Sequence, residues 1–312
     1  MIYAGIDVGG TNIKAALVDE NRELLCKTSV PTGVGRPYPM LVKDMAEAVV
    51  SLTAQQGIKI SDLAGAGIGI PGVAHNGVAI VHNLYWFDIP LAEEFKKHAD
   101  IPVVIDNDAT AAALYEYHLG AMADCSVGVL ITLGTGVGGG IIIDGKPFSG
   151  AHGLGSEIGH IAIVPGGLQC TCGNKGCLEV YGSAGALVRL GRRCVIDRPE
   201  SMLHHVTNGD HMKVTPQLIF DTAKNGDYVA ESIVDEYVYY LSMGVCTIEN
   251  FVDPDVIAFG GGISGAGDYL LQKLVKASRG LGIFENKQYA EIKLAKAGND
   301  AGVIGAALLA MV

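Results

Sequence analysis

The most concentrated chemistry in the sequence lies between residues 160 and 177, where one histidine is followed by three cysteines. These residues are His160, Cys170, Cys172 and Cys177. Thiolate sulfur and imidazole nitrogen are the usual ligands of structural zinc, and four protein ligands complete a tetrahedral site. The spacing therefore predicts a closed, non-catalytic zinc site. Reduced cysteines that bind no metal are the alternative.

Two glutamates flank this run, Glu157 before it and Glu179 after it. Carboxylates accept pairs of hydrogen bonds, which suits the neighbouring hydroxyls of a sugar. If His160 binds zinc through one ring nitrogen, its other nitrogen is fixed in tautomer and can face a ligand. We therefore expect Glu157, His160 and Glu179 to line a sugar pocket. The alternative is that both glutamates are solvated surface residues.

Two glycine-rich turns, residues 7–14 and 134–140, have the composition of phosphate-binding loops. Glycine lets backbone N–H groups approach an anion, and an aspartate nearby can hold Mg²⁺. Neither turn is a P-loop or a dinucleotide fingerprint, because the lysine pattern is absent and each turn leads into a strand. An ordinary hairpin turn is the alternative for each. The residues expected at the nucleotide are Asp7, Gly9, Gly10, Thr11, Asn12, Lys14, Gly134, Thr135 and Gly136.

A third polar cluster, Asp106, Asn107 and Asp108, stands between an apolar run and an alanine-rich segment. A carboxylate at the carboxyl end of a buried strand is well placed to act as a general base. The alternative for Asp108 is a cap on the helix that follows.

Alternating and helical apolar patterns define the elements that must position these residues. We expect a hairpin at 2–18, strands at 22–29, 64–70, 102–105, 126–133, 141–143 and 256–259, and helices at 39–56, 109–120, 182–197, 215–225, 228–251 and 301–311. Asp300 is the expected N-cap of the last helix. Two strand–glycine turn–strand units stand about 130 residues apart, which indicates a duplicated α/β fold.

Composition excludes several classes of protein. The 312 residues carry a net charge of −11, which disfavours nucleic-acid binding. No apolar stretch reaches the ~20 residues of a membrane span, and the amino terminus reads directly into a strand without a leader pattern. The clustering of cysteines favours metal binding over disulfides. We expect a cytoplasmic protein with no nucleic-acid or membrane partner.

Taken together, the motifs resemble the ROK family of sugar kinases and sugar-responsive repressors over essentially the whole chain. The matching segments are 5–11, 69–72, 107–109, 133–140, 150–153, 157–160, 170–179 and 260–262. Two positions depart from the family pattern. Ser156 stands where glycine is usual and Thr110 where asparagine is more common.

The resemblance implies an actin-like ATPase fold, of the ribonuclease H-like type, with two lobes around a cleft. The small lobe would comprise residues 1–115 and 299–312, and the large lobe residues 116–298 with the zinc loop. The family also implies a homodimer. Its repressor branch carries an amino-terminal helix-turn-helix, whereas here the phosphate hairpin begins at residue 2, so we do not expect a DNA-binding repressor.

The resemblance also implies roles for individual residues. Asp108 would remove the proton from the sugar 6-hydroxyl, which attacks the γ-phosphate of ATP bound with Mg²⁺. Sugar hydroxyls would be held by Gly72, Asn83, Asn107, Asp108, Glu157, His160 and Glu179. Gly261 and Gly262 would lie against the nucleoside. The sequence from Asn83 to Leu91 resembles the glucokinase members, which implies glucose. N-acetylmannosamine, N-acetylglucosamine, allose or fructose as substrate, or a non-catalytic sugar sensor, are the alternatives.

Overall fold

The computed structural model describes residues 1–283, 288–298 and 300–312 of the chain. Residue 299, the expected first residue of the carboxyl-terminal part of the small lobe, lies outside this description. The described chain divides into two compact units. Unit 1 comprises Met1–Ser126, Gly140–Ser156 and Lys296–Val312, and unit 2 comprises Val127–Gly139 and Glu157–Ala295. The lobe boundaries expected at 115 and 299 stay a prediction.

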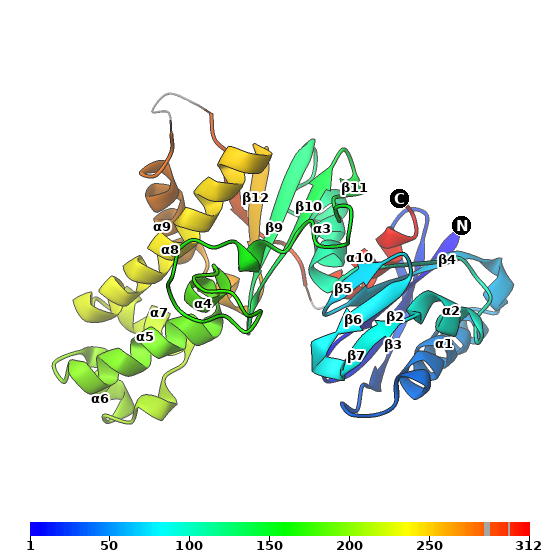
Figure 1. Ribbon diagram of the computed structural model, residues 1–312, viewed down its shortest axis with the longest axis horizontal. Helices are drawn as coiled ribbons and strands as arrows, with labels where there is room; N and C mark the ends of the chain where they lie inside the picture. The colour runs from blue at the N-terminus through cyan, green and yellow to red at the C-terminus, as the bar shows by residue number, and fades with distance from the viewer. Residues whose placement is uncertain (284–287, 299) are drawn as a thin grey trace. The chain divides into compact units, whose positions relative to one another are not determined.

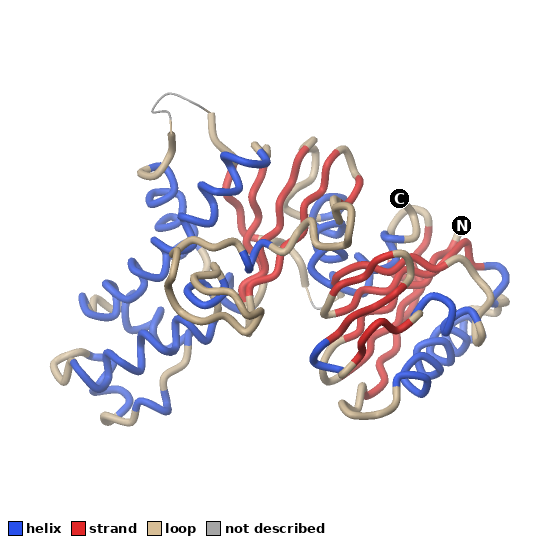
Figure 2. Tube along the Cα trace, in the orientation of Figure 1, coloured by secondary structure: helices blue, strands red, loops and turns tan. Residues whose placement is uncertain are grey.

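Two five-stranded sheets share one strand order, which confirms the duplicated fold (Figures 1 and 2). The first has the order β3-β2-β1-β4-β8 and the second β11-β10-β9-β12-β13. In the first, β1 pairs antiparallel with β2 and parallel with β4. In the second, β12 pairs parallel with both β9 and β13. The strands of the first sheet are β1 (Ile2–Val8), β2 (Asn12–Asp19), β3 (Leu24–Pro31), β4 (Leu63–Ile70) and β8 (Val103–Asn107). Those of the second are β9 (Val127–Leu133), β10 (Val137–Ile143), β11 (Lys146–Pro147), β12 (Val256–Gly260) and β13 (Glu291–Leu294).

The helices and strands expected from the sequence are all present, with small shifts at their ends. The expected helices appear as α1 (Tyr38–Gln55), α3 (Asp108–Leu119), α5 (Ala184–Asp197), α7 (Pro216–Lys224), α8 (Tyr228–Val252) and α10 (Ala301–Leu309). The helix expected at 182–197 is interrupted at Ser183, whose hydroxyl caps α5, and α4 (Glu179–Gly182) precedes it. In unit 2, α5, α7 and α8 pack together (Figure 1).

Several elements were not predicted from the sequence. They are a three-stranded sheet of β5 (Val73–His75), β6 (Val78–Val81) and β7 (Trp86–Ile89), strands β11 and β13, and helices α2 (Leu91–Lys96), α6 (Met202–Thr207) and α9 (Asp268–Arg279). None of the described helices is long and apolar enough to cross a membrane.

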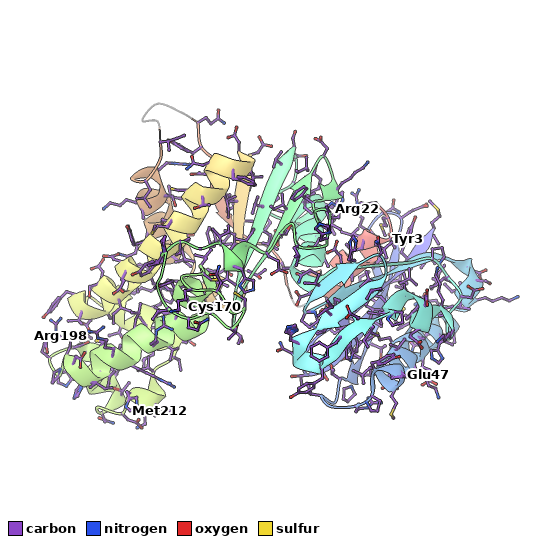
Figure 3. The ribbon with its side chains drawn as sticks, in the orientation of Figure 1. Tyr3, Arg22, Glu47, Cys170, Arg198 and Met212 are labelled. Atoms are coloured by element: carbon purple, nitrogen blue, oxygen red, sulfur yellow. The ribbon has the colours of Figure 1, made fainter. Side chains whose placement is uncertain are left out.

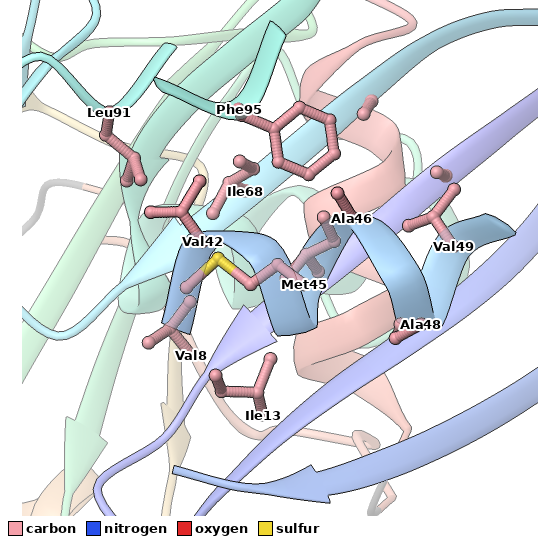
Figure 4. Close-up of a cluster of buried hydrophobic side chains, with 14 of the residues drawn as sticks. Val8, Ile13, Val42, Met45, Ala46, Ala48, Val49, Ile68, Leu91 and Phe95 are labelled. Carbon is pink, nitrogen blue, oxygen red and sulfur yellow. The ribbon is translucent and has the colours of Figure 1, made fainter. Parts of the chain in front are cut away.

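The core of unit 1 forms under α1, whose apolar face covers the first sheet (Figure 4). Val42, Met45 and Val49 recur at helical spacing on this face and are fully buried. They pack in one cluster with side chains of β1, β2 and β4 and with Phe95 of α2. Burial of such side chains supplies the main driving force for folding.

The opposite face of β4 carries glycine at alternate positions, and helices pack directly against its backbone. A Cβ on Gly67 would lie 1.8 Å from the Ala306 oxygen of α10, and one on Gly5 of β1 would lie 2.0 Å from the Val303 oxygen. A Cβ on Gly69 would lie 3.5 Å from the Cα of Asp108. These contacts fix α10 and the start of α3 on the sheet.

A buried carboxylate ties α3 to the chain that leads into α10. Glu116 is fully buried. Its Oε2 accepts hydrogen bonds from the backbone N–H groups of Ala121 (2.6 Å) and Lys296 (3.2 Å), and its Oε1 accepts one from Ala297 (2.6 Å). Three donors offset the cost of burying this group.

Asp300 is the N-cap residue of α10, as expected, although its side chain makes no cap bond and instead accepts from Lys27 Nζ at 2.6 Å. The alternative considered for Asp108, a cap on the following helix, is not what the structure has. The side chain that caps α3 belongs to Asn107, which accepts from the Ala109 N–H at 2.8 Å, and Asp108 is the first residue of the helix.

Gly67→Ala should destabilise the protein by at least about 3 kcal/mol, the upper end of the usual cost of overpacking, because its methyl group would overlap a backbone oxygen. Gly65→Ala is the matched control on the same face of β4, since its nearest contact would be 3.3 Å. Urea unfolding of both variants measures the difference. Equal stability of the two variants would contradict this packing.

Candidate active site and metal centre

The polar cluster at the carboxyl end of β8 is held by a network of hydrogen bonds. The Asn107 side chain donates from Nδ2 to the Gly72 oxygen at 2.9 Å while its Oδ1 accepts from Ala109. Asp108 is half-buried and is the first residue of α3, directly after Asn107. The expected sugar contacts Gly72, Asn107 and Asp108 are therefore neighbours in unit 1. Asn83 is exposed in the short helix His82–Leu84.

The first glycine turn joins β1 to β2 with its tip in solvent. The Gly9 N–H donates to the Asn12 oxygen at 3.0 Å, and the Thr32 hydroxyl donates to the Gly9 oxygen at 2.6 Å. Gly10 and Thr11, at the tip, are exposed. Two bonds thus fix the base of the turn and leave its tip accessible to an anion.

Asp7 lies beneath this turn, opposite Lys14 in the register of the two strands. Burial raises the pKa of the Asp7 carboxyl, and the charge of Lys14 partly opposes that rise. A Cβ on Gly302 would lie 2.7 Å from Asp7 Oδ2, so the carboxylate lies against the first turn of α10. A carboxylate near a helix amino terminus and below an exposed glycine turn is suitably placed to hold Mg²⁺.

The second glycine turn joins β9 to β10. The Gly134 N–H donates to the Gly136 oxygen at 3.0 Å, and the Gly134 oxygen accepts from the Ala184 N–H at the start of α5. Glu179 packs against the turn, since its Oε2 accepts from the Val137 N–H at 3.1 Å. A Cβ on Gly136 would lie 2.4 Å from this oxygen, so glycine leaves room for the carboxylate.

His160, Cys170, Cys172 and Cys177 gather in unit 2 with one ligand atom of each within 4.8 Å of the others. Cys170 Sγ lies 3.7 Å from His160 Nδ1, and Cys172 Sγ lies 3.7 Å from Cys177 Sγ. Figure 3 labels Cys170 in the long loop that precedes α4. Such spacing suits four ligands of one tetrahedral ion, because zinc bonds to sulfur and nitrogen are about 2.0–2.3 Å long.

The pKa values of two thiols in the cluster shift in opposite directions. Burial, with the neighbouring thiols, raises the pKa of Cys177 to about 12, whereas a hydrogen bond from the Asn174 backbone lowers the pKa of Cys172. A bound cation would replace the thiol protons, since metal ligands are thiolates. Gly176 closes the loop tightly, because a Cβ there would lie 1.8 Å from the Val164 oxygen.

The expected sugar-binding residues of unit 2 surround this cluster. His160 Nε2 faces Glu157 Oε2 at 3.8 Å, so the ring spans from the sulfurs to that carboxylate. Cys170 Sγ lies 3.8 Å from Glu179 Oε1. Both glutamates are half-buried. Glu157, His160 and Glu179 thus lie together at the cluster, where each can form hydrogen bonds.

A cavity of about 330 Å³, which was not predicted from the sequence, lies beside the three consecutive glycines at residues 260–262. A Cβ on Gly261 would lie 2.4 Å from the Leu133 oxygen, so this residue packs on β9, while Gly262 lines the cavity. The remaining lining comes from α7 and from the 3₁₀ helix Gly262–Ala266 before α9: Pro216, Gln217, Phe220, Asp221, Lys224, Ile263, Gly265 and Ala266. No sequence motif marks α7, but its residues lie against the expected nucleoside contact.

Comparison with known proteins decides the family. The ROK family model matches residues 3–312. The chain belongs to the ROK family.

Individual ROK relatives extend this match. A glucokinase of Halalkalibacterium halodurans is 37% identical over 307 residues, covering 97% of this chain and 93% of the relative. The crystal structure of a ROK glucokinase from Streptomyces griseus, in complex with glucose and AMPPNP, has a TM-score of 0.81 and 34% identity and covers 100% of this chain and 99% of its own. The ROK hexokinase of Thermus thermophilus has a TM-score of 0.84 and 31% identity over 100% of this chain and 98% of its own. The two sheets described above are therefore those of the ROK kinase fold.

Proposed function

We propose that this protein transfers the γ-phosphoryl group of Mg·ATP to the 6-hydroxyl of glucose. The observation that carries the proposal is full-length similarity to a ROK glucokinase whose structure contains glucose and AMPPNP, together with the Asp108 helix start and both glycine turns. Glucose is favoured over other hexoses because relatives named glucokinase reach 35–37% identity over nearly the whole chain.

Asp108 is the proposed general base. Its carboxylate would accept the proton of the sugar 6-hydroxyl as that oxygen attacks phosphorus. Its Asn107 neighbour is fixed on both sides by hydrogen bonds and would orient a sugar hydroxyl. Phosphoryl transfer depends mainly on positioning and charge neutralisation, so a rigid base suits the reaction.

The two glycine turns are the proposed phosphate-binding loops. Gly9, Gly10, Thr11 and Asn12 in unit 1 would donate to phosphate oxygens, with Lys14 and Asp7 beneath them for charge and Mg²⁺. Gly134, Thr135 and Gly136 would do so in unit 2. The 330 Å³ cavity beside Gly262 would take the nucleoside, because it is concave and mixes apolar with polar lining groups.

Zinc is the proposed ion of the Cys₃His cluster. Since all four ligand positions are taken by protein atoms, the ion would hold structure and carry no substrate. It would fix the His160 ring with Nε2 directed toward Glu157. A cytoplasmic location and a homodimer complete the proposal. The homodimer is what the family resemblance implies, and the location is the one expected from the sequence.

A panel of hexoses in an ADP-coupled assay tests the activity. We expect the highest kcat/KM with glucose and lower values with N-acetylmannosamine, N-acetylglucosamine, allose and fructose, because one altered ring substituent costs roughly 1–3 kcal/mol in a fitted pocket. A higher value with another hexose would replace glucose in the proposal. ADP formation with none of them would favour a sugar sensor.

Asp108→Asn should lower kcat by roughly 10²–10⁴, the scale of a general base, with glucose affinity largely kept. Asp268→Asn is the matched control, because Asp268 is likewise the first residue of a helix, α9, and is exposed. It should keep the wild-type kcat. Turnover of Asp108→Asn within threefold of the wild type would remove Asp108 from this role.

Cys172→Ser should abolish stoichiometric zinc, lower the Tm and weaken glucose binding by roughly tenfold, or 1.4 kcal/mol. Elemental analysis, thermal unfolding and calorimetric titration with glucose measure the three effects. Cys26→Ser, which changes a half-buried cysteine of β3 outside the cluster, should alter none of them. Wild-type protein that binds glucose with normal affinity but contains no zinc would refute this account.

A further inference from the structure

Asp106 precedes the proposed sugar contact Asn107 and the proposed base Asp108, and its side chain has no role in the proposed reaction. Both of its carboxylate oxygens accept hydrogen bonds. Oδ1 accepts from the Asn107 N–H at 2.7 Å, and Oδ2 accepts from the Ser149 hydroxyl at 2.6 Å. Asp106 is half-buried at the end of β8. Its carboxylate thus connects the strand end to a distant part of the sequence.

Ser149 belongs to the loop of residues 148–156, whose two ends are joined by hydrogen bonds. The Ser149 oxygen accepts from the Gly155 N–H at 2.9 Å, and the Ser156 hydroxyl donates to the Phe148 oxygen at 2.8 Å. The loop also lies directly on β5, since a Cβ on Gly153 would lie 2.3 Å from the Ala74 oxygen. Ser149 therefore presents its hydroxyl from a fixed position.

The strand that carries Asp106 needs such support. β8 is the last strand in the order of its sheet and is paired with β4. Beyond this pairing, the direction of its last peptide depends on side-chain bonds. Asn107 is held through Gly72 and Ala109, and Asp106 is held through Ser149. Rotating the peptide that leads into Asp108 would break at least one of these bonds.

We propose that Asp106 and Ser149 are a positioning pair that orients the general base Asp108. Ser149 donates to Asp106, Asp106 fixes the Asn107 N–H, and the helix start that carries Asp108 follows. Neither residue touches the substrate in this scheme. The inference rests on the proposed function of Asp108, and misplacement of a reacting group by about 1 Å can cost about 10²-fold in rate.

Ser149→Ala tests the pair. We expect kcat with glucose to fall by roughly 10- to 100-fold, with the KM for ATP and the Tm close to wild type. Ser149→Thr, which retains a hydroxyl, should restore most of kcat. Ser156→Ala is the matched control, because it removes a hydroxyl that donates within the same loop but does not bond Asp106. It should leave kcat unchanged.

A double variant separates this inference from the proposed function. In the Asp108→Asn background, Ser149→Ala should lower the residual rate no further, because the pair acts through Asp108. If Ser149→Ala alone keeps kcat within twofold of Ser156→Ala, or if its effect adds fully to that of Asp108→Asn, the positioning role is wrong. Full activity of Asp108→Asn alone would instead overturn the proposed base.

Discussion

The structure of unit 1 depends on how closely two helices approach the first sheet. The face of β4 that lies opposite α1 carries glycine, as does the neighbouring position Gly5 of β1. Backbone atoms of α10 therefore pack directly against backbone atoms of the sheet. Close packing leaves little freedom for the helices to slide or tilt. The same contacts place the start of α10 beside Asp7 and the start of α3 beside Gly69. Both proposed active-site carboxylates of unit 1 therefore take their positions from an interface built of glycine and alanine.

Glu116 extends this constraint. Its carboxylate is buried without a cationic partner among the bonds it makes, and it is stabilised by three backbone N–H groups from two segments. Bonds of this kind hold their geometry better than a surface ion pair, because few alternative donors reach a buried group. The segment bonded by Glu116 at Lys296 is where the chain returns to unit 1. Helices α3 and α10 are thus joined at this point as well as packed on the sheet.

Sequence patterns predicted the long elements and the grouping of His160 with the three cysteines, because both leave local signatures. Helical spacing of apolar residues marks α1 and α8, and four ligands within eighteen residues mark the cysteine loop. The contacts of Glu179 had no such signature. Its bond to the Val137 N–H joins residues 42 apart in sequence, and the room for it comes from Gly136. The cavity beside Gly262 was missed for the same reason, since α7 reaches it only through the tertiary fold. The short sheet β5-β6-β7 was missed because its strands have only three or four residues.

The two aspartates at helix starts show why position alone could not assign their roles. Asp108 and Asp300 each follow the last parallel strand of a duplicated sheet, and a capping role was considered for both. In the structure neither side chain makes the cap. Asp300 pairs with Lys27 at 2.6 Å, which neutralises its charge at a partly exposed site. Asp108 instead follows a segment in which Asn107 and Asp106 are each fixed by distant partners, Gly72 and Ser149. A carboxylate used for proton transfer needs such a rigid support more than it needs a cap, because its reaction depends on geometry. The duplication supplies two helix starts that each carry an aspartate, and the two aspartates have different neighbours: Lys27 beside Asp300, and the Gly72 and Ser149 bonds before Asp108.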